Sequence, residues 1–269
     1  MAGVRGHASG SPAQSSLPAR LVVGADGLHS TVARKAGARA YQSRPPLTAM
    51  YYSYWSGISH LGASFHIRPG RLILTWPTND DLTCIYVAWP RQEFAEVRTD
   101  VENHFHSALD LVPGLRDTVA SGRREGRFTG TGDLPNLYRT SAGPGWALAG
   151  DAGHHKDPST GMGMSDAFQA ARLLAEAIHD GLAGHRPIDE ALAGYQHQRD
   201  ELTASGFGLT LATARLAPLT ARLEAFYRAA AEQPEVSRQV FGVLGGSLPA
   251  AGVYPGRHTE TAPAAPTGL

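Results

Sequence analysis

Hydrophobic residues along the chain follow two different spacings. The aliphatic run Leu21–Val23 stops at a Gly-Ala-Asp-Gly turn, and a short stretch follows that Ser30 can cap and Gly37 can end. This order predicts a buried strand, a turn and a short helix. The run Trp146–Ala149 is followed in the same way by a glycine-rich turn and a longer helix over residues 163–178. The sequence therefore predicts two strand–turn–helix units that lie far apart in the chain.

Between these units the spacing changes to that of strands. Four runs rich in aromatic and β-branched residues, separated by turn residues, predict an antiparallel sheet: Tyr51–Ile58, Ser64–Arg68, Arg71–Trp76 and Leu82–Trp89. Helical spacing over Gln92–Leu111 predicts one helix that packs on this sheet. After the second unit, Pro187 is expected in the first turn of a long helix, where Gly206 and Gly208 favour an interruption, and further helices are expected to about Val243.

Composition excludes several classes of protein. Lys plus Arg and Asp plus Glu both number 24, so the formal net charge is zero and nothing favours a nucleic-acid partner. Cys84, which we expect in the core, is the single cysteine, so an internal disulfide or a cysteine-based zinc site is excluded and a reducing compartment is favoured. No apolar run has the length of a signal-peptide core or a membrane span. We therefore expect a cytoplasmic protein without a membrane span.

Candidate chemistry lies where the two predicted strands end. Each unit places an Asp beside a Gly there, in Asp26–Gly27 and Gly150–Asp151. In an open α/β sheet this position suits ligand binding, because backbone N–H groups are free and the next helix adds positive partial charge. Asp151 can accept hydrogen bonds from sugar hydroxyls, and Gly161 and Gly163 at a helix start can direct N–H groups at an electron-rich atom. Such N–H groups suit a flavin, whose reduced ring gathers negative charge on one edge.

These residues resemble two motifs of the FAD-dependent monooxygenases of the aromatic hydroxylase class and related flavin oxidoreductases. The segment Gly24–Arg34 is similar to the family's Asp-Gly motif, which contributes to FAD and nicotinamide-nucleotide binding. The segment Gly150–Ala167 is similar to its Gly-Asp motif, in which the Asp contacts the ribityl chain and the Pro and glycines lie beside the isoalloxazine. The resemblance implies that these residues bind the cofactor: Asp26, Gly27, Arg34, Gly150, Asp151, Pro158, Gly161, Met162 and Gly163.

The resemblance also implies a fold class. We expect a mixed α/β protein: an incomplete FAD-binding Rossmann-like domain with an inserted antiparallel β-sheet substrate domain and C-terminal helices. The FAD-binding domain would comprise residues 1–45 and 136–243, the substrate domain residues 46–135, and a disordered tail residues 244–269.

The family's Gly-x-Gly-x-x-Gly unit, which binds the ADP half of FAD, has no counterpart before Leu21. Val4–Gly6 is expected instead to form a hairpin with Arg20–Gly24. We therefore interpret the chain as the C-terminal two-thirds of a flavoprotein, which would result from a misassigned start, a fragment or a real truncation. We expect this chain by itself to bind FAD weakly or not at all.

Several residues depart from the family pattern or have simpler interpretations. Arginine often follows the valine of the Asp-Gly motif directly, whereas Ala33 precedes Arg34 here, and Ala170 stands where the family often has Asp. Asp26 alone would be interpreted as a turn residue and Asp151 as the cap of the following turn. Their pairing in two motifs favours cofactor contact. His154 and His155 lack a suitable third ligand nearby, so no metal site is expected and a surface or supporting role is favoured.

The predicted function is that of an FAD-dependent oxidoreductase, an NAD(P)H-using monooxygenase that hydroxylates a small organic substrate. Two alternatives stay open. One is a non-catalytic remnant, or a fragment that needs a partner to supply the missing FAD-binding unit. The other is a flavin-dependent reductase of an isoprenoid-type substrate. The sequence identifies no catalytic side chain.

Overall fold

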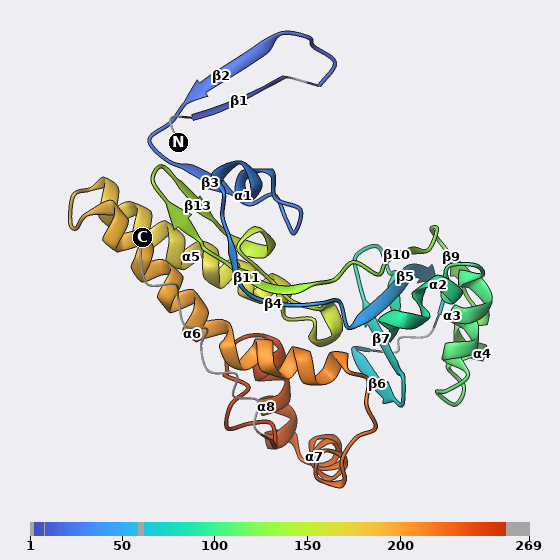
Figure 1. Cartoon of the computed structure of the whole chain (residues 1–269). Helices are drawn as coiled ribbons and strands as arrows, with labels where there is room; N and C mark the ends of the chain where they lie inside the picture. Colours follow the sequence, from blue (N-terminus) through green and yellow to red (C-terminus); the bar gives the residue numbers. More distant parts are fainter. Residues whose placement is uncertain (1–2, 8, 59–61, 257–269) are drawn as a thin grey trace.

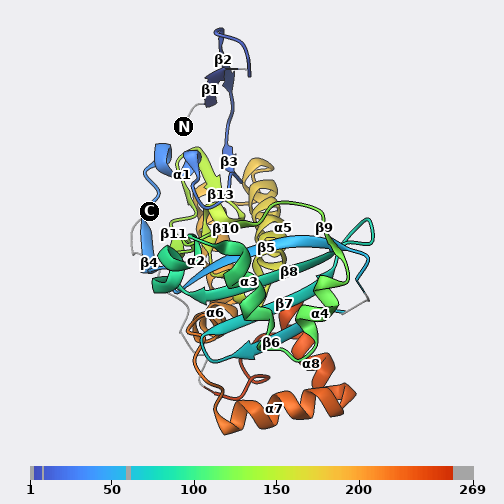
Figure 2. The same cartoon turned by 90° about the vertical axis from the view of Figure 1, so that its right-hand side faces the viewer.

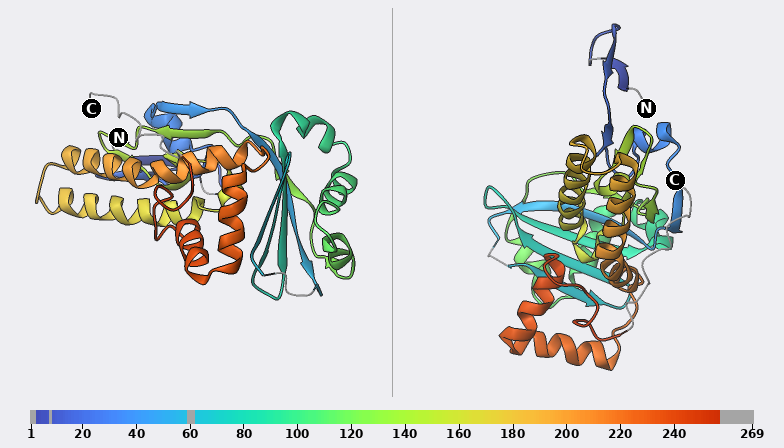
Figure 3. Two further views of the ribbon diagram at one scale, coloured as in Figure 1. Left: turned by 90° about the horizontal axis from the view of Figure 1, so that it is seen from below. Right: turned by 90° about the vertical axis from the view of Figure 1, so that its left-hand side faces the viewer.

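The computed structural model describes residues 3–7, 9–58 and 62–256. A twisted antiparallel sheet lies between two groups of helices (Figure 1 and Figure 3, left). Helices α2 (Phe94–Val97), α3 (Val101–Leu109) and α4 (Leu115–Ala120) cover one face. The two longest helices, α5 (Gly163–Leu182) and α6 (Ile188–Ala214), lie side by side on the other side of the sheet and belong to the α/β part of the molecule. The mixed α/β class predicted from the sequence is confirmed.

The two predicted strand–turn–helix units come together in a small sheet. Strand β3 (Val22–Gly24) pairs in parallel with β13 (Trp146–Leu148), and β12 (Ala142–Gly143) pairs with β13 on its other side. Helix α1 (Thr31–Ala36) follows β3 as predicted: the Ser30 hydroxyl accepts a hydrogen bond from the Ala33 N–H at 2.8 Å, and Gly37 ends the helix. Because parallel strands end at one edge of a sheet, both motif turns lie at the same edge.

A second small sheet connects this part to the large one. Strand β11 (Asn136–Arg139) pairs with β4 (Ala40–Arg44) on one side and β14 (His154–His155) on the other. The chain enters the large sheet after β4 and leaves it before β11, so the sheet is an insertion between the two motif units.

The large sheet contains the four predicted strands, which are confirmed with end shifts of a few residues. Its order is β10 (Thr129–Thr131), β5 (Thr48–Ser56), β8 (Thr83–Pro90), β7 (Arg71–Pro77) and β6 (Ser64–Arg68), and β9 (Arg123–Arg124) pairs with the end of β5. All of these pairs are antiparallel (Figure 2). Alternating side chains of β5, β7 and β8 meet Phe105 and Leu109 of α3 in an aromatic and aliphatic core. Cys84 is buried in β8, as expected.

The single helix expected over Gln92–Leu111 is wrong. A 3₁₀ turn η1 (Arg91–Glu93), helix α2 and helix α3 take its place. The Asp100 side chain accepts a hydrogen bond from the Asn103 N–H at 3.2 Å and starts α3 as a new helix. Local capping by Asp therefore outweighs a continuous apolar stripe.

The interruption expected at Gly206 and Gly208 is also wrong, because α6 is continuous through both. A Cβ at Gly206 would lie 2.9 Å from Met162 Cε and 3.2 Å from Lys156 Nζ. Gly206 thus lets α6 approach the second motif closely, and packing offsets the weak helix propensity of glycine. Helices α7 (Ala221–Glu232) and α8 (Pro234–Leu244) follow.

Two further expectations about the ends of the chain need correction. Strand β1 (Gly3–His7) pairs with β2 (Gln14–Pro18), and not with Arg20–Gly24; this hairpin projects from the remainder of the molecule (Figure 1). The disorder expected from residue 244 is wrong for residues 245–256, where Ala250 and Tyr254 are buried against the C-terminal helices. Residues 257–269 lie outside the described residues. Over the part of the chain that is described, no helix combines the length and apolar character needed to cross a bilayer.

Candidate cofactor site

The two motif turns open onto one groove of about 660 Å³, which we call the motif groove. It lies at the carboxyl ends of β3 and β13, beside the first turns of α5. Six of the nine predicted cofactor residues line it: Gly27, Gly150, Asp151, Pro158, Gly161 and Gly163. The structure therefore brings together most of a site that the sequence divides between two distant segments.

Glycines leave the floor of the motif groove open. Gly161 has a φ of +68°, in the left-handed region that favours glycine, and ends the 3₁₀ turn η3 (Pro158–Thr160). A Cβ at Gly27, Gly161 or Gly163 would meet no atom within 4 Å, so these positions border open space. A planar ring can therefore lie directly against the backbone there.

Polar groups of the second motif face the same space without partners of their own. Asp151, in the 3₁₀ turn η2 (Gly150–Ala152), is exposed, and its carboxylate makes no hydrogen bond to the described residues, so it does not cap that turn. Helix α5 begins at Gly163 without a side-chain cap, which leaves its first N–H groups available to a ligand. A carboxylate for hydroxyl groups and helix N–H groups for an electron-rich ring edge thus lie along one groove.

Three predicted site residues do not line the motif groove. The Asp26 carboxylate is occupied by α1: it accepts hydrogen bonds from the Ser30 hydroxyl at 2.5 Å and from the Thr31 N–H at 2.7 Å. Arg34 lines a separate polar hollow of about 320 Å³, which also includes Arg139. The Met162 side chain is buried in the apolar cluster between α6 and α8.

Other residues that line the motif groove were not predicted from the sequence. They lie in turns and on β5, β14 and α5: Ala25, Met50, Leu134, Ala149, His155, Lys156, Met164, Ala167, Phe168 and Ala171. Those on α5 follow the i, i+3, i+4, i+7 spacing of one helix face, counted from Met164, and this spacing could have identified them. Met50 and Leu134 come from the inserted segment, and the sequence carries no signal for their position.

Buried charges lie directly behind the motif groove. Lys156 Nζ is 2.5 Å from Asp166 Oδ2 on α5, and His154 Nδ1 is 3.8 Å from the same oxygen. Burial raises the pKa of Asp166, and the positive charge of Lys156 opposes this shift. Burial, together with Lys156 and Arg199, lowers the pKa of His154 well below its usual value, so His154 is neutral near pH 7.

The positions of the two histidines correct one expectation. His154 and His155 are both buried, so a surface position is wrong. His154 stacks on Tyr138 with ring centroids 4.3 Å apart, and His155 Nδ1 lies 2.5 Å from the Pro135 carbonyl oxygen. No cluster of three or more potential metal-ligating side chains occurs within the described ranges.

The motif groove suits the flavin and ribityl portions of FAD. Its volume is in the range of small-molecule sites, and three glycines border open space on its floor. The unpartnered Asp151 carboxylate matches sugar hydroxyls, and the α5 N–H groups match a ring edge that becomes negative on reduction. The residues present therefore fit the cofactor that the motifs implied.

Two curated enzymes that are similar to this chain are a halogenase and a monooxygenase. A tryptophan 2-halogenase of Chondromyces crocatus is 29% identical over 154 residues, which are 54% of this chain and 30% of the halogenase. A kynurenine 3-monooxygenase of Salinispora arenicola is 29% identical over 204 residues, which are 69% of this chain and 43% of that enzyme. No protein-family model matches the sequence.

Solved structures agree with these relatives. The myxobacterial chondrochloren halogenase, an FAD-dependent halogenase, matches with a TM-score of 0.72 at 20% identity, over 91% of this chain and 62% of its own. The homologues and structural neighbours of this chain thus include FAD-dependent halogenases and monooxygenases of the flavin-dependent hydroxylase class, which are oxidoreductases. A digeranylgeranylglycerophospholipid reductase of Methanocella arvoryzae is also similar, with 26% identity over 190 residues, which are 66% of this chain and 45% of the reductase. The resemblance found in the sequence is confirmed. The chain spans less than half the length of these three curated relatives.

Proposed function

We propose that the chain is the flavin-facing part of an FAD-dependent oxidoreductase, with NAD(P)H as electron donor and a small organic molecule as substrate. One observation carries this proposal: six glycine, proline and aspartate positions from two distant motifs line a single groove whose open floor fits a flavin.

The residues of the motif groove have distinct roles in this proposal. Asp151 accepts hydrogen bonds from ribityl hydroxyls, and the first N–H groups of α5 face the edge of the ring that gains negative charge on reduction. Lys156, held by Asp166, adds a positive charge behind that edge. Bound FAD would supply the redox chemistry, and the chain would position the ring and exclude water. Asp26 acts indirectly, because its carboxylate fixes α1 and thereby the position of Gly27.

The relatives suggest hydroxylation, halogenation or, from the digeranylgeranylglycerophospholipid reductase, reduction of an isoprenoid-type substrate. The motif groove alone favours none of the three. We propose a monooxygenase, because the match to the kynurenine 3-monooxygenase covers 69% of this chain, whereas the match to the tryptophan 2-halogenase covers 54%. Product analysis with and without bromide separates these reactions, because a hydroxylated product would identify a monooxygenase, a brominated product a halogenase and a hydrogenated product a reductase.

We further propose that a polypeptide segment with a glycine-rich nucleotide-binding turn completes the FAD site, as part of a longer chain or as a partner. The surface beside the motif groove supports this. Among the described strands, β3 has a pairing partner on one edge only. Met164 and Phe168 of α5 border the motif groove and are 76% and 78% exposed, which is unusual for large apolar side chains.

Titration of FAD and of riboflavin into the chain, followed by flavin fluorescence, tests the proposed function. Both flavins are expected to bind with similar affinity, since the motif groove contacts the part they share. Asp151→Ala should weaken both roughly tenfold or more, because it removes charge-assisted hydrogen bonds. Asp117→Ala, on the exposed side of α4 far from the motif groove, is the matched control and should change nothing. Equal binding by the two variants, or no binding of either flavin, would contradict the proposal.

A further inference from the structure

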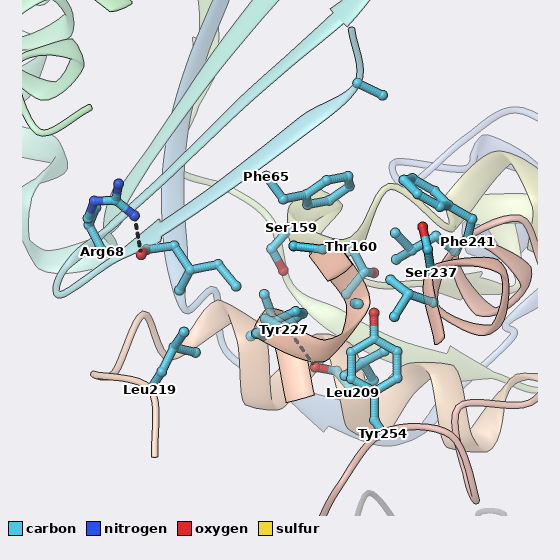
Figure 4. Close-up of a pocket in the computed structure, with 17 residues that line it drawn as sticks. Phe65, Arg68, Ser159, Thr160, Leu209, Leu219, Tyr227, Ser237, Phe241 and Tyr254 are labelled. Atoms are coloured by element: carbon cyan, nitrogen blue, oxygen red, sulfur yellow. Dashed lines mark hydrogen bonds between the residues drawn. The ribbon is translucent and has the colours of Figure 1, made fainter. Parts of the chain in front are cut away.

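A second cavity lies on the other side of the η3 turn, and we call it the apolar cavity (Figure 4). Its volume is about 500 Å³, and its walls come from β6, η3, α6, α7 and α8. Pro158 and Gly161 line the motif groove, whereas Ser159 and Thr160 between them line the apolar cavity. A single short turn therefore separates the two spaces.

The walls of the apolar cavity are mainly hydrocarbon. Most of the side chains are aliphatic or aromatic: Ala63, Phe65, Ile67, Leu209, Leu219, Ala230, Ala231, Val240, Phe241 and Leu244. Among the described residues that line the cavity, Arg68 alone is charged. Its Nε donates to the Leu111 carbonyl oxygen at 3.1 Å and its Nη1 donates to the Ile67 carbonyl oxygen at 3.0 Å. None of these described lining residues carries a carboxylate that could pair with a cation.

The hydroxyl groups of the apolar cavity are mostly engaged within the protein. Thr160 Oγ1 lies 2.7 Å from Thr210 Oγ1, and the Thr213 hydroxyl donates to the Leu209 carbonyl oxygen at 3.0 Å. The Ser237 hydroxyl makes no hydrogen bond to the described residues and points toward the cavity in Figure 4. The Ser159 hydroxyl is buried and also has no hydrogen-bond partner among the described residues. The wall thus offers two small hydroxyl groups for polar contacts and nothing to compensate a positive charge.

We infer that the apolar cavity binds a largely apolar organic molecule that has one or two rings, at most a few polar atoms and no positive charge. Burying a cation there would cost its hydration without a compensating carboxylate and beside the positive charge of Arg68, whereas a neutral ring system would gain from apolar contact. The volume suits a ligand of this size. The binding of this molecule is inferred from the cavity alone. Its identification as the substrate of the flavin reaction rests on the proposed function.

Probes that carry a positive charge, compared with neutral ones, test this inference. N-phenylnaphthylamine, which is neutral, should bind the intact 269-residue chain with increased fluorescence, and the same ring system with a fixed trimethylammonium group should bind roughly tenfold more weakly or worse. In competition, neutral naphthol should displace N-phenylnaphthylamine and protonated naphthylmethylamine should not. Equal affinity of the charged and neutral probes would overturn the inference.

Substitutions on α7 locate the probe. Ala230→Trp fills part of the apolar cavity and should weaken N-phenylnaphthylamine binding roughly tenfold or more. Ala225→Trp adds the same side chain at an exposed position of α7 that does not line the cavity, and should leave binding unchanged. Ser237→Val keeps the shape but removes the hydroxyl, so it should weaken naphthol more than N-phenylnaphthylamine. Equal effects of the two tryptophan variants would place the probe elsewhere and refute the assignment.

Asp151→Ala distinguishes this inference from the proposed function. It should weaken flavin binding and leave N-phenylnaphthylamine binding as in the wild type. If flavin fails to bind while the neutral probe binds and Ala230→Trp removes it, the proposed function is wrong and the apolar cavity stands. If flavin binds and the neutral probe does not, the proposed function stands and the inference about the apolar cavity is wrong.

Discussion

The core under the large sheet and the region behind the motif groove are both buried, but apolar packing stabilises the first and paired charges the second. Under the sheet, Trp55 stacks on Phe105 with ring centroids 5.6 Å apart, among aliphatic side chains and without a buried charge in the cluster. Behind the motif groove, charged side chains are buried: Lys156 and Asp166 pair at 2.5 Å, and their side chains are 2% and 11% exposed. Burying ions is costly unless they are paired. We infer that the charges fix the position of the second motif and set the electrostatic potential at the motif groove, whereas the sheet core contributes stability.

A second buried ion pair connects α6 to the second motif. Arg199 Nη2 lies 2.6 Å from Asp200 Oδ1, and Arg199 Nη1 donates to the Gly153 carbonyl oxygen at 3.2 Å. The Tyr41 hydroxyl donates to Asp200 at 2.6 Å. These contacts join β4, α6 and the motif turn, so the turn is fixed from behind by polar groups.

The largest expected effect comes from breaking one of these pairs. Lys156→Met leaves the Asp166 carboxylate buried without its cation and should lower the free energy of unfolding by about 3–5 kcal/mol. The double variant with Asp166→Leu should recover much of this loss, since both charges are then gone. Urea unfolding of the four proteins measures the coupling. A double variant no more stable than Lys156→Met would show that the pair matters for packing and not for charge.

A truncation under the sheet should show no such rescue. Ile85 is fully buried in β8, and Ile85→Ala should lower the free energy of unfolding by about 2–5 kcal/mol through lost apolar contact and a cavity. Urea unfolding at low and high salt should give the same loss. A strong dependence on salt would contradict a purely apolar core.

A smaller effect is expected at the first motif, where Asp26 is exposed. Burial acts to raise the pKa of Asp26, but hydrogen bonds from Ser30, Thr31 and Val32 outweigh it and hold the pKa below the usual 3.8. The ionised carboxylate therefore stabilises the fold above the unfolded-state pKa, and this contribution is lost as pH falls through the folded-state value. Asp26→Asn should cost about 1 kcal/mol at pH 7 and nothing below the folded-state pKa. Unfolding measured at several pH values checks this; a constant difference would exclude the carboxylate charge as the cause.

Local sequence signals predicted much of this molecule. The capped helix after Ser30 and the strand–turn signals of the inserted sheet are short-range, and each was found close to its expected position. Glycine spacing in the second motif also identified most of the groove floor. What failed depends on tertiary contact: Gly206 stays helical because α6 packs on the motif, and Tyr254 is buried because the C-terminal helices fold over it. Lys156 was missed as a site residue because only the fold brings Asp166 beside it.

The most direct test of the central claim, that a flavin lies in the motif groove, is backbone hydrogen exchange with and without excess FAD. The amides of residues 24–27 and 150–164, which surround the groove, are expected to exchange more slowly when FAD is present, and Asp151→Ala should reduce this protection. The amides of α4, on the far face of the sheet, should not change. Protection confined to the polar hollow at Arg34 and Arg139, or no protection at either motif turn, would contradict the account.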